Sequence, residues 1–481
     1  MCVTLATGVR RLEGRAGATV LLGGSPLRLL NLRPGAGRVL DELLGGAPVG
    51  QRPKVMAMAR RLLDAGVLDP CWPVDAPGRA QASDVTVVIP VKDRQASLSQ
   101  LLDALNAVGP THRPGQVVVV DDGSSDGSSE AATSRGATVV RNETSLGPSG
   151  ARNRGLAEVQ TDLVAFVDSD CVPRPGWLPP LLAHLDDPTV AVVAPRIVGR
   201  AGATGMVARY EAGRSPLDLG AIGGYIQPTT RLAYVPSAAL LVRTAAIRGV
   251  GGFDADLRVG EDVDLLWRLE RMDWRLRYEP GAEVVHAHRE RLGELLARRA
   301  QYGTSAALLD QRHPGKVPPL AMSGWSATAW GLAALGGPPG AVAGVATALA
   351  TAALLPRKLP VLADPWPVAL DLALHGHIGA GRQLGAALWR TWLPIALAAS
   401  VPSRRVRRTV LMGGLLPALA DWRRQRPGID PARYVALRLA DDSAYCAGVW
   451  LGCIRRRRFT ALLPQFRNWP DRRQPSEDQR P

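Results

Sequence analysis

Short valine-rich segments alternate with helical patterns through the middle of the chain, and this alternation limits the possible folds more than any other feature. The segments VTVVIPV (85–91), QVVVVD (116–121) and LVAFV (163–167) are rich in β-branched residues, which is typical of buried parallel strands. Leucines at helical spacing over residues 98–105 predict a helix between the first two strands. Strands that alternate with helices predict an α/β fold with a doubly wound sheet.

Acidic residues stand where these strands end. Asp121 and Asp122 close the second strand, and Asp168 and Asp170 follow the third. Because ligands of open α/β sheets bind outside the carboxyl ends of the strands, we expect these carboxylates to line one crevice. Two carboxylates at positions i and i+2 repel one another unless a cation lies between them, and Mg²⁺ or Mn²⁺ would suit their oxygens. Asp168 and Asp170 are the predicted metal ligands, although aspartates at strand ends also form turns and helix caps.

Two further segments support a phosphate-binding crevice. In GPSGARNRG (147–155), glycines permit close backbone approach, Arg152 can form a bidentate contact with phosphate, and Asn153 can bond a ring hydroxyl. In GEDVDLLWRL, a helix is expected to begin with Glu261 and Asp262 in its first turn. Either segment alone is also compatible with an ordinary glycine-rich turn or an acidic helix start.

Together these segments resemble the inverting glycosyltransferases with a GT-A, nucleotide-diphospho-sugar fold. The matching stretches, in chain order, are VVIPVKDR, DDGSSD, GPSGARNRG, FVDSDCV and GGFDADLRVGEDVDL. The resemblance implies that Asp93 and Asp121 contact the nucleoside, and that Asp122, Arg152 and Asn153 help to bind the donor.

The same resemblance implies a divalent cation, Mn²⁺ or Mg²⁺, held together with a diphosphate by Asp168 and Asp170. It implies Asp262 as the general base, with Glu261 orienting it or the substrate. An inverting transfer needs one base to remove the acceptor hydroxyl's proton and separate cationic groups to neutralise the departing diphosphate. This division of labour explains why the carboxylates form two clusters.

The segment after the acidic helix carries two histidines, His286 and His288. In related enzymes a histidine near this place completes the metal or diphosphate site, so either imidazole is a candidate. Both could equally serve as ordinary hydrogen-bonding groups at a strand end. The following RRAQYGTS resembles the region where nonprocessive relatives keep basic groups near the leaving group. The sequence lacks the QxxRW motif of processive polysaccharide synthases, which argues against long-chain synthesis.

Residues 1–72 are predicted to form a small N-terminal domain, and the turn-rich residues 73–84 a linker to a transferase domain at 85–315. Short extended stretches precede two amphipathic helical patterns, LNLRPGAGRVLDELLGG and RPKVMAMARRLLDAG. This order resembles the winged-helix-like modules typified by the PqqD chaperone, which capture precursor peptides at a strand edge and an adjoining helix. The alternative is a winged-helix domain that only packs, or that touches DNA through basic residues: Arg52, Lys54, Arg60 and Arg61.

Residues 316–481 alternate very apolar and very basic stretches. No charged side chain occurs between Lys316 and Arg357, but glycines and prolines at 336–339 divide this run into pieces shorter than the about 20 residues that cross a bilayer. Apolar segments beside arginine clusters favour an anionic membrane surface, reached by a hairpin in one leaflet or by packed interfacial helices. A soluble alanine-rich helical domain is the alternative.

Charge and cysteine content bear on partners and compartment. The formal net charge of +15 indicates an anionic partner. Nucleic acid is not the expected partner, because binding to it would not explain the acidic clusters at the strand ends. The five cysteines show no metal-ligand or redox spacing and predict reduced thiols, and the N-terminus shows no secretory signal. We expect the protein at the cytoplasmic face of the membrane.

The combination of a peptide-recognition-like module, this transferase and an apolar tail resembles, over essentially the whole chain, the glycosyltransferases of the mycofactocin system. That family implies transfer of glucose from UDP-glucose to the peptide-derived redox cofactor mycofactocin or its precursor, giving a short β-linked oligoglucose chain. Two alternatives remain. One is a transferase that acts on a membrane glycolipid or a cell-wall polysaccharide, and the other is a noncatalytic sugar-nucleotide sensor, which would need Asp168 but not Asp262.

Overall fold

The computed structural model describes residues 2–46, 52–72, 80–202, 204–228, 230–287 and 290–467. Contacts divide the chain into two compact units. The first unit contains Met1–Val9, Gly23–Leu27 and Val39–Glu290, and the second contains Arg10–Leu22, Arg28–Arg38 and Arg291–Pro481. Parts of the predicted N-terminal domain therefore occur in both units. Most of the predicted linker, residues 73–79, lies outside the described residues.

A nine-stranded mixed sheet, counted over the described residues, forms the centre of the first unit, with the order β10-β14-β11-β13-β9-β6-β7-β8 and with β12 paired to β14. The parallel part contains β9, β6, β7 and β8, whereas β13 runs antiparallel to both β9 and β11. The strand bounds are β6 (Val85–Val91), β7 (Gln116–Asp121), β8 (Thr138–Arg141), β9 (Leu163–Val167), β10 (Cys171–Pro173), β11 (Val190–Gly199), β12 (Gly224–Tyr225), β13 (Ala239–Arg243) and β14 (Arg275–His286).

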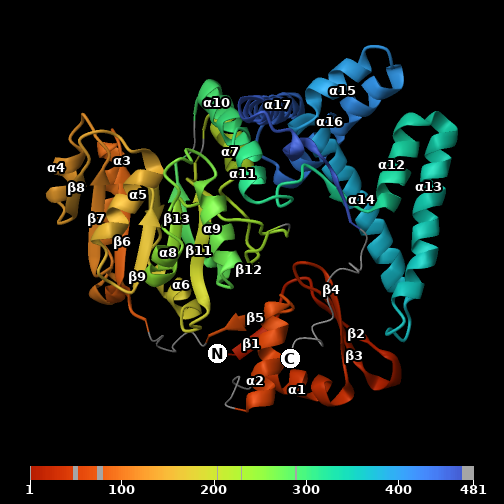
Figure 1. The fold of residues 1–481 in the computed structure, drawn as a ribbon, viewed down its shortest axis with the longest axis horizontal. Helices are drawn as coiled ribbons and strands as arrows, with labels where there is room; N and C mark the ends of the chain where they lie inside the picture. The colour runs from red at the N-terminus through yellow and green to blue at the C-terminus, as the bar shows by residue number, and fades with distance from the viewer. Residues whose placement is uncertain are drawn as a thin grey trace. The chain divides into compact units, whose positions relative to one another are not determined.

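Helices cover both faces of this sheet (Figure 1). Their bounds are α3 (Gln95–Asn106), α4 (Ser128–Thr133), α5 (Gly147–Glu158), α6 (Leu178–His184), α7 (Met206–Arg214), α8 (Thr244–Gly249) and α9 (Glu261–Arg271). Val87 of β6 packs in the core with α3 and α6, and the next residue, Val88, packs in the core with α5 and α9. Because both faces are covered, the strands are almost continuously apolar.

Elements from the N-terminal region complete the first unit. β1 (Cys2–Leu5) pairs antiparallel with β5 (Leu68–Cys71), and α2 (Pro53–Asp64) precedes β5. Ion pairs join α2 and β5 to β14: Arg275 bonds Asp64 through two nitrogens at 2.6 and 2.7 Å, and Arg277 bonds Asp69 at 3.0 Å. Arg60, considered above as a DNA contact, instead bonds Asp187 of the transferase part.

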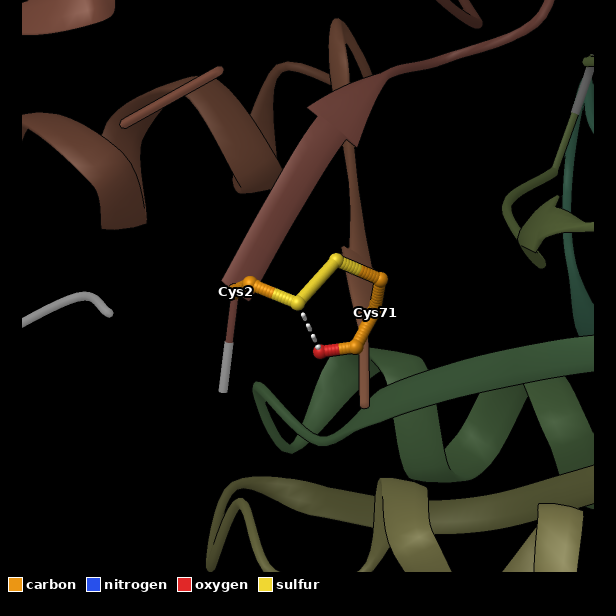
Figure 2. The surroundings of a disulfide bond; sticks show 2 residues. All are labelled: Cys2 and Cys71. Carbon is orange, nitrogen blue, oxygen red and sulfur yellow. Dashed lines mark hydrogen bonds between the residues drawn. A yellow bond between two sulfur atoms is a disulfide. The ribbon is translucent and has the colours of Figure 1, made fainter. Parts of the chain in front are cut away.

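Cys2 and Cys71 form a disulfide (Figure 2). The prediction that all five cysteines are reduced thiols is therefore wrong for this pair, while Cys171, Cys446 and Cys453 are free and buried. The antiparallel register places Cys2 directly opposite Cys71 although 69 residues separate them in the chain. Sequence spacing cannot show such a pairing, because the contact depends on which strands are neighbours.

The second unit begins with a small sheet and continues with helices. Its sheet contains β2 (Arg10–Glu13), β3 (Thr19–Gly23) and β4 (Arg28–Leu32). The helix α1 (Pro34–Leu44) follows, and its residues up to Arg38 belong to this unit. Val20 and Leu22 of β3 pack against Leu359, Leu362 and Val368. The N-terminal sheet is thus part of the same core as the segment that begins the long C-terminal helices.

The helices of the second unit pack closely on one another, and α12 and α13 lie side by side (Figure 1). Gly337–Lys358, which comprises α13 and the short helix η4, is the one described segment long and apolar enough to cross a membrane. The prediction that every apolar piece falls short of this length is therefore wrong for this piece.

The helices of the second unit after residue 290 have the following bounds: α10 (Leu292–Gly303), α11 (Ala306–Arg312), α12 (Gly324–Leu335), α13 (Gly337–Leu354), η4 (Leu355–Lys358), α14 (Trp366–Arg390), α15 (Leu393–Ser400), α16 (Arg404–Gln425) and α17 (Pro431–Arg456).

Candidate active site

The turn between β9 and β10, called the aspartate turn below, carries Asp168 and Asp170. Each of the two carboxylates has an arginine partner of its own. Arg152 of α5 donates to Asp168 Oδ1 over 2.6 Å. Arg94, just before α3, donates to Asp170 Oδ2 over 2.8 Å. The repulsion expected between two neighbouring carboxylates is thus offset by two cationic side chains.

This pair of carboxylates fits a divalent cation that also binds a diphosphate. The side chains of Asp168 and Asp170 are 31% and 21% exposed, so a ligand can reach them. Magnesium and manganese are commonly held by one or two carboxylates while substrate phosphates supply further oxygens. Among the described residues, no group of three or more His, Cys, Asp or Glu could hold a metal. The diphosphate would therefore have to provide much of the coordination.

His286 is the last residue of β14 and lies directly opposite Cys171. Cys171 begins β10, the strand that follows Asp170 in the chain. Its Nε2 lies 3.8 Å from Oδ2 of Asp170, which places an imidazole beside the predicted metal ligands. His288, the other candidate, lies outside the described residues. The structure therefore brings one of the two histidines to the site.

Arg152 connects the two carboxylate clusters. Its guanidinium is buried, with 2% exposure, and it donates to Asp168 and, over 3.1 Å, to Oε1 of Glu261. Burial opposes its charge, but attraction by Asp168 and Glu261 outweighs burial and raises the pKa of Arg152 above the ordinary value. The residue therefore remains charged and holds the aspartate turn and the start of α9 together.

Asp262 lies beside Glu261 in the first turn of α9. The helix begins after Gly260, whose φ of +82° is the left-handed conformation that favours glycine. Burial, helped by repulsion from Glu261, raises the pKa of Asp262 to about 7, against the opposing effects of a backbone hydrogen bond from Val263 and of the Arg152 charge. A carboxylate with a pKa near neutrality is suited to accept a proton.

Asp93 and Asp121, the predicted nucleoside contacts, are both hydrogen-bonded to the turn after β7 that carries Ser124 and Ser125. Asp93, at φ +51°, accepts from the backbone N–H and the hydroxyl of Ser125. The carboxylate of Asp121 is fully buried and accepts 2.8 Å bonds from the Ser124 N–H and from Arg141. The structure thus brings both residues to the carboxyl ends of β6 and β7.

The side chains of Asp122 and Asn153 form hydrogen bonds with other residues of the protein. Asp122 accepts hydrogen bonds at 2.7 to 2.9 Å from four groups at the approach to α5: the side chains of Asn142 and Ser145, and the backbone N–H groups of Leu146 and Gly147. The amide of Asn153 bonds both the N–H and the carbonyl of Phe253, at 2.8 and 2.6 Å. These contacts fix α5 and the loop before α9, so both residues position parts of the site.

Sequence reasoning missed Arg94 as the partner of Asp170. The only signal for Arg94 was its place next to Asp93 in the strand-end motif VKDR. Arg299, in the second unit, is 5% exposed and pairs with Asp441 of α17 at 2.7 Å. Arg299, which lies in RRAQYGTS, therefore joins α10 to α17. The sequence could not show this contact, because its partner belongs to a helix far along the chain.

Comparison with known proteins places this chain in a family. The profile of Glycosyl transferase family 2 matches residues 86–248, which include the aspartate turn and Arg152. Over 469 residues the chain is 43% identical to "Pre-mycofactocin glycosyltransferase" of Mycobacterium tuberculosis (strain ATCC 25618 / H37Rv), covering 95% of this chain and 97% of that protein. The chain belongs to the pre-mycofactocin glycosyltransferase family. It is a glycosyltransferase, and the predicted GT-A fold and enzyme class are confirmed.

More distant relatives match about half of the chain or less. The chain is 29% identical over 238 residues to N-acetylglucosaminyl-diphospho-decaprenol L-rhamnosyltransferase of M. tuberculosis, covering 43% of this chain and 78% of that one. Among solved structures, glucosyl-3-phosphoglycerate synthase from M. tuberculosis is 24% identical, with a TM-score of 0.34, over 51% of this chain and 87% of that chain.

Proposed function

We propose that this glycosyltransferase transfers glucose from UDP-glucose to the peptide-derived redox cofactor mycofactocin or its precursor, and that it builds a short β-linked oligoglucose chain. The observation that carries the proposed acceptor is the likeness to the pre-mycofactocin glycosyltransferase over 95% of this chain and 97% of the relative. The donor UDP-glucose and the oligoglucose product rest on the family resemblance given in the sequence analysis. A match of this extent includes residues of both units, so it goes beyond the nucleotide-sugar part.

Asp262 is the proposed general base of an inverting transfer. Its pKa of about 7 lets it exist as a carboxylate at neutral pH and still accept the acceptor hydroxyl's proton as that oxygen attacks the anomeric carbon. Glu261 cannot share this role easily, because its carboxylate is paired with Arg152 at 3.1 Å. Glu261 is instead proposed to orient the start of α9 and keep the pKa of Asp262 high.

Asp168 and Asp170 are proposed to hold a divalent cation, Mn²⁺ or Mg²⁺, with His286 beside them. When bound, such a cation would neutralise charge on the departing diphosphate. Arg152 and Arg94 already contact these two aspartates, so they are proposed to help bind the donor's diphosphate.

The remaining donor-binding residues are proposed to act from the sheet edge. Asp93 and Asp121 would contact the nucleoside, and Asp122 and Asn153 would keep α5 and the loop before α9 in place for it. The polar groups of the strand-end turns are already oriented by their own hydrogen bonds, which reduces the entropy lost when the donor binds.

We also propose that residues 1–72 act as a PqqD-like peptide-recognition domain.

The protein is further proposed to attach to an anionic surface at the cytoplasmic face of the membrane. Support for attachment comes from exposed arginines of the second unit, Arg404, Arg405, Arg407 and Arg408, which stand beside apolar helices.

The experiment that tests the proposed reaction incubates purified protein with UDP-glucose, Mn²⁺ and the mycofactocin precursor, and follows mass increments of one hexose. We expect successive increments that require the metal and disappear in Asp168→Asn. Control reactions would use other UDP-sugars and a membrane glycolipid. Transfer to the glycolipid but not to the precursor would overturn the proposed acceptor, and the exposed apolar helices of the second unit make the glycolipid the acceptor to compare.

A further inference from the structure

The helix α13 carries its small residues inside and its large apolar residues outside. Gly340 and Gly344 are buried between helices. Val342, Val345 and Leu349, on the outer side, are 70%, 62% and 62% exposed. A helix of a water-soluble bundle shows the opposite distribution, because large apolar side chains gain most from burial.

The helix α14 repeats this pattern. Leu370, Leu374 and Ile378 recur at intervals of four residues and are 59%, 56% and 42% exposed. Ala369 and Ala373, the residues before two of them, are 0% and 7% exposed. Two neighbouring helices thus present aliphatic stripes outward, and the residues they bury are mostly alanine and glycine, with Val368 of α14 as an exception.

Glycine at the inner positions brings the helix backbones close together. A Cβ atom on Gly340 would lie 2.3 Å from the carbonyl oxygen of Leu332, and one on Gly344 would lie 2.6 Å from that of Ala329. Such close packing through small residues stabilises helix pairs in lipid, where burying large apolar side chains between helices brings no hydrophobic gain.

The outer surface of α13 and α14 is also hollowed. A hollow of about 490 Å³ is lined by apolar residues alone: Leu349, Ala352, Ala353, Trp366, Pro367 and Leu370. It has the chemistry to receive a hydrocarbon chain, since its lining offers almost no polar surface to a ligand.

Cationic residues stand at both ends of α13. Arg357 and Lys358 follow directly in η4, where both are exposed. At the other end, Arg405 of α16 donates to the carbonyl of Leu335, the last residue of α12, over 3.2 Å. This arrangement of an apolar surface between basic groups is complementary to a lipid with acyl chains and an anionic headgroup.

We infer that the outward surface of α13 and α14, called here the aliphatic face, is inserted among the acyl chains of an anionic phospholipid membrane. The face is defined by Val342, Val345, Leu349, Leu370, Leu374 and Ile378. This inference rests on the proposed membrane attachment and deepens it from a contact with headgroups to burial in hydrocarbon.

The test places a nitroxide spin label at Val345→Cys in the full chain. The native cysteines are bonded or buried, so the label goes to the new thiol. Collision rates with oxygen, which concentrates in hydrocarbon, and with a water-soluble nickel complex are measured with and without phosphatidylglycerol vesicles. Vesicles are expected to raise oxygen collisions at least threefold and to suppress nickel collisions. A matched label at Met272→Cys, 64% exposed in the first unit, should remain accessible to nickel.

Three other outcomes are informative. If the protein floats with the vesicles while the label stays accessible to nickel, insertion is wrong but surface attachment stands. If the protein does not float, both proposals fail. If nickel and oxygen are both excluded without lipid and the mass doubles, a second copy of the chain covers the face and the inference is overturned. A Val345→Asp, Leu349→Asp variant supplies the functional counterpart: flotation should fall at least tenfold, while transfer to a soluble acceptor is retained.

Discussion

The first unit contains two pairs of acidic residues whose surroundings differ: Asp168 with Asp170, and Glu261 with Asp262. In the aspartate turn, each carboxylate has one arginine partner, at 2.6 Å for Asp168 and 2.8 Å for Asp170. At the start of α9, Arg152 pairs with Glu261, and burial raises the pKa of its neighbour Asp262 to about 7. The comparison shows that carboxylates in one protein acquire different surroundings from their neighbours, and the two surroundings correspond to the two proposed roles, cation ligand and general base.

The largest expected effect comes from removing the proposed base. Asp262→Asn should lower kcat by about 10³-fold, because an amide cannot take the acceptor's proton. Because burial penalises the ionised carboxylate, the melting temperature at pH 8 should stay the same or rise. The matched control is Asp162→Asn, an exposed carboxylate just before β9, which should leave both quantities unchanged. Near-normal turnover in Asp262→Asn would remove the distinction between the two pairs.

The pH profile should depend on the ionisation of Asp262. With a pKa of about 7, the base is protonated as pH falls below neutrality, so kcat/KM should drop about tenfold for each pH unit below that value. The measurement is the initial rate of hexose transfer between pH 5 and 9, with protein stability followed in parallel. A profile flat to pH 5 would contradict the proposed role.

Replacing the residue shared by both pairs should have a smaller effect. Arg152→Lys keeps the charge but cannot reach Asp168 and Glu261 with two fixed nitrogens, so kcat/KM should fall about tenfold. The optimum should also move along the pH axis, because the partner of Glu261 is altered. Arg154→Lys, on an exposed position of the same helix, is the control. Equal rates for the two variants would show that the contacts of Arg152 with Asp168 and Glu261 do not contribute to catalysis.

The smallest effect is expected at the exposed partner of Asp170. The side chain of Arg94 is 54% exposed, so Arg94→Ala should cost less than about 1 kcal/mol of folding stability. The apparent affinity for the UDP-sugar should weaken about threefold, because one cationic group near the diphosphate is lost. A loss as large as that of Asp262→Asn would mean that the aspartate turn depends on Arg94 more than on the cation.

Much of the fold followed from local pattern. β-branched runs at 85–91, 116–121 and 163–167 became β6, β7 and β9, and the acidic helix start became α9 at Glu261. Strand and helix periodicity are local properties, so they can be read without knowing neighbours. The antiparallel β13 in the middle of the sheet was not predicted, because its direction depends on how distant segments pair.

The site was predicted as a set of residues but not as a set of contacts. The acidic residues at the strand ends were found because parallel strands bring their carboxyl ends to one edge. That Asp122 accepts four hydrogen bonds from the approach to α5, or that Arg152 joins Asp168 to Glu261, depends on segments up to 109 residues apart. Motif spacing contains no information on such distances.

The strands and the carboxylates at their ends could be predicted before any contact was known, since they depend on residue type and on periodicity along the chain. The transferase class was predicted from the resemblance of the ordered motifs to a known family. The folded chain was needed to show which carboxylate is paired and which one has a raised pKa, that Cys2 meets Cys71, and that α13 turns Val342 outward and Gly344 inward. Burial, hydrogen-bond partners and charge neighbours are set by contacts between distant segments, and these contacts control the electrostatic and hydrophobic free energies of each side chain.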